Sequence, residues 1–248
     1  MTPASNTWTP QRAAKIAGAA YLLTYAPVYS WLVVYPKLFV AGDFARTATN
    51  IMAHAQLFRL TIVLDLLTVA GVVILNLALY ELLAPVHRSL ARLAAFWRLV
   101  ESAVYAATTV CTFAVLSVLS GADYLQAFEP RQLQALARLL LGAYTSGFWV
   151  AMFFLSLGST IYCYLLVRSR YIPRVLALFG VTASVLAVVG ILTRFLFPAF
   201  ITATFAAVRT LPVAALVLLA LIVVPILSFE LTIGTWLLVK GVRIPEHT

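Results

Sequence analysis

Long apolar runs separated by short polar stretches dominate the chain. Runs that reach the roughly 20 residues needed to cross a bilayer as a helix lie at 13–35, 57–83, 93–119, 130–167, 173–197 and 212–239. The fourth begins with an amphipathic lead at 130–138, and Pro27 interrupts the first. This pattern predicts an all-α, polytopic transmembrane helical bundle with six transmembrane helices.

Two connecting pieces have the pattern of short helices. Residues 42–58, GDFARTATNIMAHAQLF, are typical of a short interfacial helix. Pro130 favours a helix start, because proline suits the first helical position. No hydrophilic stretch is long enough for a soluble domain, so we expect residues 1–248 to form a single transmembrane domain.

The composition agrees with a membrane protein. The chain is 63% apolar and 10% charged, whereas soluble domains are about 45–50% apolar and about 25% charged. The N-terminal apolar run has bilayer length and no clear cleavage site, so it is interpreted as a retained helix rather than a signal peptide. The net charge of +9 is explained by topology-setting residues that flank spans, and no nucleic-acid partner is expected.

Basic residues are modestly more frequent at the span ends that share a side with both termini. By the positive-inside rule this distribution predicts cytoplasmic termini. Cys111 and Cys163 both fall within spans and are interpreted as small packing residues. Nothing in their spacing argues for a disulfide or a metal site, and no cofactor signature is present.

Three acids lie inside apolar runs: Asp65, Glu101 and Glu230. A carboxylate at the centre of a transmembrane helix costs about 2.5–3.5 kcal/mol on insertion scales, so each needs a partner or a use. Residues three or four apart share a helix face, which places Arg98, Glu101 and Tyr105 on one polar stripe. Asp65 and Asn76 share a face of the preceding run with Thr61 and Thr68.

Depth separates these groups. At 1.5 Å per residue, Arg98, Glu101 and Glu230 fall in the inner half of the bilayer, whereas Asp65 lies in the outer half. Asp65 can instead join arginines near the outer ends of the runs, which are Arg59, Arg138 and Arg194. Pro225, five residues before Glu230, removes a backbone hydrogen bond and predicts irregular backbone beside that acid.

These patterns also have structural explanations. Arg98 and Glu101 can be an intrahelical ion pair that lets both residues be buried. A salt bridge to Arg138 or Arg194 would explain Asp65 in the same way. Whether Asp65 joins the site of Glu101 and Glu230 is left open by the sequence.

Several segments resemble a bacterial family of uncharacterised six-helix membrane proteins, a domain of unknown function. They are RAAKIAGAAYLLTY, TATNIMAHAQLFRLTIVLDLL, AFWRLVESAV, FEPRQLQALARLLL, LLVRSRYIPRVLALF and FELTIGTWLLVKGVR, spread over nearly the whole chain. The resemblance implies the six-helix architecture and a bacterial inner membrane location. It supports Arg59, Asp65, Arg98, Glu101 and Glu230 as family-type positions, and it implies no activity.

Two functions from different classes fit these residues. The first is an enzyme that performs acid–base chemistry on a lipophilic, isoprenoid-like substrate, as a cyclase or isomerase. Small integral-membrane terpene cyclases also use paired acids, an analogy of architecture that transfers no residues. The expected catalytic residues are Glu101, Glu230, Asp65 and Arg98, and the expected substrate-binding residues are Tyr105, Asn76, Arg59, Arg138 and Arg194.

The second function is a small proton-coupled transporter, because intramembrane acids also serve as proton relays. A carrier of this size would be expected to form a homodimer. A membrane sensor without chemistry is the third possibility. In each case the expected partners are lipids and, for the first two, a lipophilic or transported small molecule.

Overall fold

The structure is a computed structural model that describes residues 8–123, 126–197 and 213–243, with side chains omitted over 213–223. Every regular element in these ranges is helical, which confirms the all-α prediction for the described part of the chain. Four stretches are long and apolar enough to cross a membrane: Pro10–Leu38, Ala55–Leu119, Pro130–Ser169 and Arg174–Leu196. The second stretch contains two helices, α5 (Ala55–Leu83) and α6 (Arg88–Leu119). These helices identify a membrane protein.

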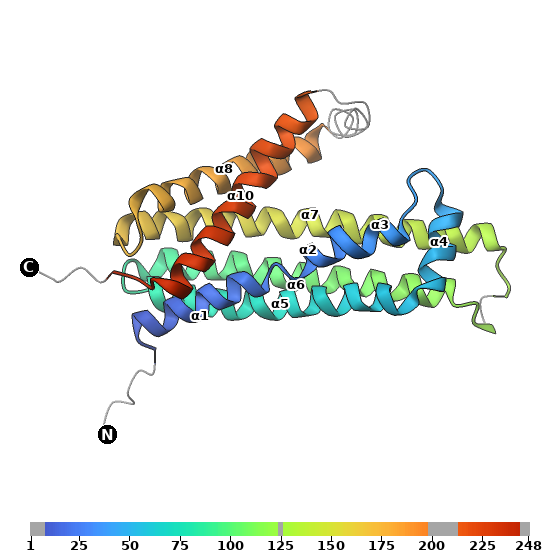
Figure 1. Ribbon diagram of the computed structural model, residues 1–248, viewed down its shortest axis with the longest axis horizontal. Helices are drawn as coiled ribbons and strands as arrows, with labels where there is room; N and C mark the ends of the chain where they lie inside the picture. Colours follow the sequence, from blue (N-terminus) through green and yellow to red (C-terminus); the bar gives the residue numbers. More distant parts are fainter. Residues whose placement is uncertain (1–7, 124–125, 198–212, 244–248) are drawn as a thin grey trace, which may run out of the picture. The chain divides into compact units, whose positions relative to one another are not determined.

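The chain divides into two compact units, and each is described by itself. The first unit comprises Met1–Leu22, Val72–Glu101 and Met152–Thr248, and the second comprises Leu23–Gly71 and Ser102–Ala151. The long helices α5, α6 and α7 (Pro130–Ser169) each contribute one part to each unit, and Figure 1 shows all three as continuous ribbons.

The first unit adds α1 (Pro10–Leu23), α8 (Arg174–Leu196) and α10 (Val213–Val239) to its parts of the long helices. Its buried core contains residues of all six helices. Helix α10 packs along α8, as Figure 1 shows. Helices α1 and α10 approach closely, because a Cβ built on Gly18 would lie 2.7 Å from the carbonyl oxygen of Gly234. Small residues permit such approaches between membrane helices.

The first apolar run differs from a single helix. Helix α1 ends at Leu23, and the path continues through α2 (Ala26–Tyr29), the π-helix η1 (Ser30–Val34) and α3 (Tyr35–Leu38). Pro27 explains the break, because a proline ring clashes with the carbonyl four residues earlier, at Leu23. In η1 the backbone N–H of Tyr35 donates to the carbonyl of Ser30, a spacing of five residues.

The second unit contains these short helices together with α4 (Phe44–Ala53) and its parts of α5, α6 and α7. Its own core includes Val34, Ile51, Phe58 and Val115. Helix α4 occupies the middle of the 42–58 stretch, and the Asp43 side chain caps it by accepting a 2.9 Å hydrogen bond from the backbone N–H of Arg46. The predicted helix start at Pro130 is present, and the amphipathic lead and the span form one helix, α7.

Candidate functional site

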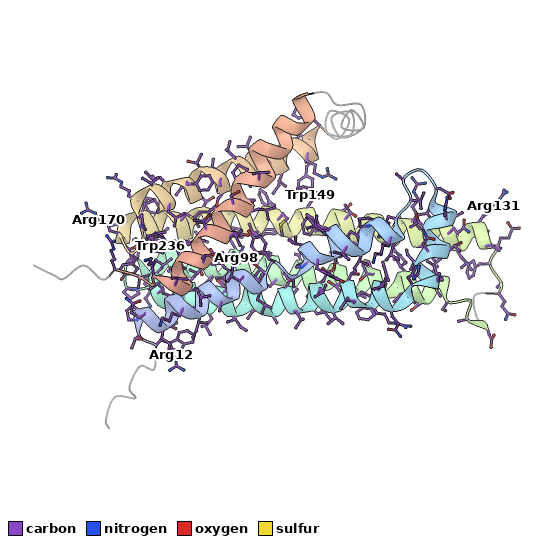
Figure 2. The ribbon with its side chains drawn as sticks, viewed as in Figure 1. Arg12, Arg98, Arg131, Trp149, Arg170 and Trp236 are labelled. Carbon is purple, nitrogen blue, oxygen red and sulfur yellow. The ribbon has the colours of Figure 1, made fainter. Side chains whose placement is uncertain are left out.

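The first unit contains a buried charge pair on α6. Arg98 Nη1 lies 2.9 Å from Glu101 Oε2, and both residues are 2% exposed. Their spacing of three residues places them on one face of the helix. Figure 2 shows Arg98 among the helices, whereas Arg12 and Arg170 extend from the surface of the unit.

Glu230 of α10 interacts electrostatically with this pair. It is half-buried and lies within electrostatic reach of both Arg98 and Glu101. We name Arg98, Glu101 and Glu230 the guanidinium cluster. One guanidinium and two carboxyls carry no net charge when the cluster holds one proton. This arrangement is therefore suited to keeping a proton inside the membrane, where a net charge raises the free energy.

Polar residues from three further helices surround the guanidinium cluster. Tyr21 of α1 and Tyr162 of α7 are buried and within electrostatic reach of Arg98. The Tyr162 hydroxyl donates a 2.6 Å hydrogen bond to Asn76 Oδ1, and Asn76 Nδ2 donates to the carbonyl of Ala95 at 3.1 Å. Asn76, predicted as a substrate-binding residue, thus lies beside the cluster and is held by two helices.

Glycine 158 fixes the position of the guanidinium. A Cβ built on Gly158 would lie 2.7 Å from Cγ of Arg98 and 3.0 Å from its Cδ. The Arg98 stem therefore packs directly against the backbone of α7, and only glycine leaves room for it.

The second unit contains a different carboxylate site. Asp65, which is 2% exposed, accepts hydrogen bonds from Tyr105 and Tyr144, with 2.8 Å between each hydroxyl oxygen and a carboxylate oxygen. Tyr35, the first residue of α3, contacts Tyr144 and lies within electrostatic reach of Asp65. We name Asp65, Tyr35, Tyr105 and Tyr144 the tyrosine cluster.

The structure groups the sequence-predicted residues as follows. It brings Arg98, Glu101 and Glu230 together in the first unit, and it brings Asp65 and Tyr105 together in the second. The hydrogen-bond partners of Asp65 are tyrosines, so the alternative of a salt bridge to Arg138 or Arg194 is not what holds its carboxylate.

The three other predicted arginines differ in exposure. Arg59 and Arg138 are exposed in the second unit, and Arg194 is half-buried near the end of α8 in the first.

Sequence reasoning missed Tyr144, Tyr162 and the role of Tyr35. Each is a tyrosine within an apolar run, and a buried phenol needs a partner for its hydroxyl. That requirement is the signal that was available. It indicates that a polar partner exists, but it does not identify which helix supplies that partner.

Within the described part of the chain, no group of three or more His, Cys, Asp or Glu side chains is placed to hold a metal ion. Cys163 is buried and Cys111 is half-buried, and both are free thiols. The side chains of the two clusters themselves carry carboxyl, guanidinium and phenol groups.

Comparison with known proteins gives a family and no activity. Neither the curated proteins nor the solved structures contain a match to the chain. A family model described as a domain of unknown function matches residues 16–241, a range that includes both clusters. The chain therefore belongs to the family of that domain, DUF4386.

Proposed function

We propose that this protein is a bacterial inner-membrane enzyme with six transmembrane helices and cytoplasmic termini, which performs acid–base chemistry on a lipophilic, isoprenoid-like substrate. The guanidinium cluster carries the proposal, because one carboxyl is paired with a buried guanidinium and a second carboxyl, from another helix, lies within electrostatic reach of it. A pair of titratable groups in unlike surroundings can divide the roles of acid and base. Glu101 is ion-paired and fully buried, whereas Glu230 is half-buried.

The proposed reaction is an isomerisation or cyclisation through a carbocation. Glu230, as the acid, donates its proton to one carbon of an alkene, and the π electrons form the new C–H bond. A carboxylate of the cluster then removes a proton from a neighbouring carbon, and the C–H electrons form the new double bond. One proton enters and one leaves, so the substrate keeps its composition. Arg98 holds Glu101 in position by its ion pair.

The proposed six spans are the stretch Pro10–Leu38, the helices α5, α6, α7 and α8, and the helix α10. Helix α10 has 27 residues, which is about 40 Å at 1.5 Å per residue and exceeds a hydrocarbon core of about 30 Å. An even number of spans leaves both termini on one side.

Deuterium transfer tests the proposed chemistry. Purified protein is incubated in D2O with prenyl lipids, and the products are examined by mass spectrometry. The enzyme is expected to place one deuterium per turnover in an isomerised or cyclised product. Glu101→Gln and Glu230→Gln should each abolish the incorporation. Glu81→Gln is the matched control, because Glu81 is a half-buried acid at the end of α5. Equal deuterium incorporation in all four proteins would refute the proposal.

A second candidate function, proton-coupled transport, is supported by the broken first run. Discontinuous helices often build transporter binding sites near the bilayer midplane, and the π-helix η1 directly precedes Tyr35 of the tyrosine cluster. The prediction of irregular backbone at Pro225 is wrong, because α10 continues through this residue as one helix and adds no second break. On this hypothesis Asp65 is the proton carrier.

Proton flux separates the two functions. The protein is reconstituted in sealed vesicles that contain a pH dye, and an outward pH gradient is imposed. A carrier moves protons with its cargo and loses the flux in Asp65→Asn, while no chemical product forms. Retention of the flux in Asp65→Asn would exclude the tyrosine cluster as the carrier site.

A further inference from the structure

The second unit has a groove whose lining contains no residue of either cluster. Its volume is about 770 Å³, within the usual range of about 300–1,000 Å³ for ligand pockets. It runs along the first half of α7, and Phe44 of α4 contributes to its wall. The lining residues are Phe44, Arg131, Gln134, Ala135, Arg138, Leu139, Gly142, Ala143 and Ser146.

The groove follows one face of α7. The lining positions on this helix recur at steps of three and four residues, which is the spacing of a single helical face. Arg131 and Arg138 lie towards the start of the helix, and Figure 2 shows Arg131 near its N-terminal end. Leu139, Gly142 and Ala143 follow. The lining thus changes from cationic to mainly apolar along the helix, and it contains no acid.

The length of α7 places the two ends of the groove in different surroundings. Its 40 residues extend about 60 Å at 1.5 Å per residue, whereas the hydrocarbon core needs only about 30 Å. The exposed Arg131 and Arg138 favour placing the first turns beyond the hydrocarbon, because a charge exposed to lipid is unfavourable. Arg131 and Arg138 are separated by about 10 Å along the axis, which spans the depth of the headgroup layer. The apolar residues that follow lie at the depth of acyl chains.

The apolar end has open space. A Cβ built on Gly142 would meet no heavy atom within 4 Å. This glycine differs from Gly147 on the next turn, where a Cβ would overlap the side chain of Thr108. Gly142 therefore leaves a gap in the groove wall and is not required by a close helix contact.

We propose that this groove binds one anionic phospholipid, with its phosphate against Arg131 and Arg138 and the start of an acyl chain along Leu139, Gly142 and Ala143. Arginine is well suited to phosphate because its planar fork donates two parallel hydrogen bonds. Basic pockets at the membrane surface bind anionic headgroups by the same attraction. The site does not depend on the chemistry proposed for the guanidinium cluster.

Native mass spectrometry of the detergent-purified full chain tests the headgroup end. Dioleoyl phosphatidylglycerol is titrated against dioleoyl phosphatidylcholine, which has the same chains and no net charge. Arg131→Gln/Arg138→Gln should weaken phosphatidylglycerol binding about 30-fold, from about 1 kcal/mol per basic residue. Arg88→Gln/Arg92→Gln is the matched control, because it removes two exposed charges on α6 and should leave binding unchanged.

Substitutions at Gly142 test the end of the groove proposed to hold the acyl chain. Gly142→Trp fills the gap and should reduce phosphatidylglycerol binding, whereas Gly142→Ala adds one methyl group and should preserve it. Thermal unfolding of each variant in the same detergent establishes that it is folded before binding is compared.

Three results would overturn the proposal. Equal loss of binding in both double-arginine variants would show that only net charge matters. Equal affinity for phosphatidylcholine and phosphatidylglycerol would remove the role of the arginines. Competition by soluble glycerol phosphate at the same concentration as the lipid would assign the groove to a water-soluble phosphate ester.

Discussion

Glu101 and Asp65 are both 2% exposed, but their carboxylates are held in opposite ways. Glu101 in the first unit faces the guanidinium of Arg98 at 2.9 Å. Asp65 in the second unit accepts hydrogen bonds from two phenols at 2.8 Å. The first carboxylate is neutralised by a charge, and the second is solvated by neutral hydroxyls that replace water.

This difference affects what each group can do. Protonating Glu101 would leave the Arg98 cation buried beside a neutral acid, which is costly unless Glu230 compensates. Protonating Asp65 leaves its neighbours neutral and requires only that one hydrogen bond reverse direction. The guanidinium cluster can therefore exchange one proton through two carboxyls beside a fixed cation, whereas the tyrosine cluster can gain and lose a proton at a single carboxyl.

The largest expected effect comes from removing the cation. Arg98→Met should destabilise the protein by about 3 kcal/mol, because Glu101 is then buried without its charge partner. Unfolding by SDS in mixed micelles measures the change. Arg98→Met/Glu101→Met should recover much of the loss, because replacing both members of a buried pair with apolar residues is often nearly neutral. If the double variant lost as much stability as the two single variants together, the interaction between Arg98 and Glu101 would contribute little to stability.

Displacing the guanidinium without changing any charge gives the next largest effect. Gly158→Ala places a methyl group 2.7 Å from Arg98 Cγ and should cost about 2 kcal/mol by overpacking. Gly142→Ala is the control, because its methyl group meets open space. SDS unfolding again compares the two, and equal stability would mean that the Arg98 stem shifts freely.

The tyrosine cluster should respond more mildly. Tyr105→Phe and Tyr144→Phe should each cost about 1–2 kcal/mol, because each removes a hydrogen bond to a carboxylate between membrane helices. In the Asp65→Asn background both effects should shrink, and this double-mutant cycle isolates the charged part of the interaction. Tyr164→Phe, at a 47% exposed tyrosine of α7, is the control. Undiminished effects in the Asp65→Asn background would show that the carboxylate's charge is unimportant.

The smallest effect is expected for a bond between neutral groups. Tyr162→Phe removes the 2.6 Å hydrogen bond to Asn76 and should cost about 0.6 kcal/mol, the average for such bonds in membrane proteins. The same SDS assay applies. A cost as large as that of Tyr144→Phe would mean that charge does not distinguish the two sites.

Helical periodicity predicted the polar face of α6, but not which residues of that face belong to each of the two clusters. Helical periodicity alone places Arg98, Glu101 and Tyr105 on one stripe. The pair of Glu101 with Arg98 is local to α6, and its spacing of three residues predicts it. The hydrogen bond of Tyr105 to Asp65 instead depends on which helix lies opposite that turn. The sequence contains no local signal for that neighbour, so the partners of Asp65 could not be derived from its own run.

Pro27 likewise predicts the break in the first run but not the π-helix that follows it. Pro27 predicts an interruption, and α1 ends four residues before it, at Leu23. The π-helix that follows depends on a choice between backbone spacings of four and five residues. Side-chain polarity does not determine that choice, so η1 could not be predicted from the pattern of the run.

The wide turn at Ser30–Val34 sets the direction of the side chains that follow it. A π-helical turn accommodates one residue more than an α-helical turn. If the same residues closed as ordinary α-helix, the extra residue would rotate every following side chain by about 100° relative to the preceding turn, and Tyr35 would face away from Asp65. The backbone spacing in this short segment thus governs whether a phenol reaches the carboxylate.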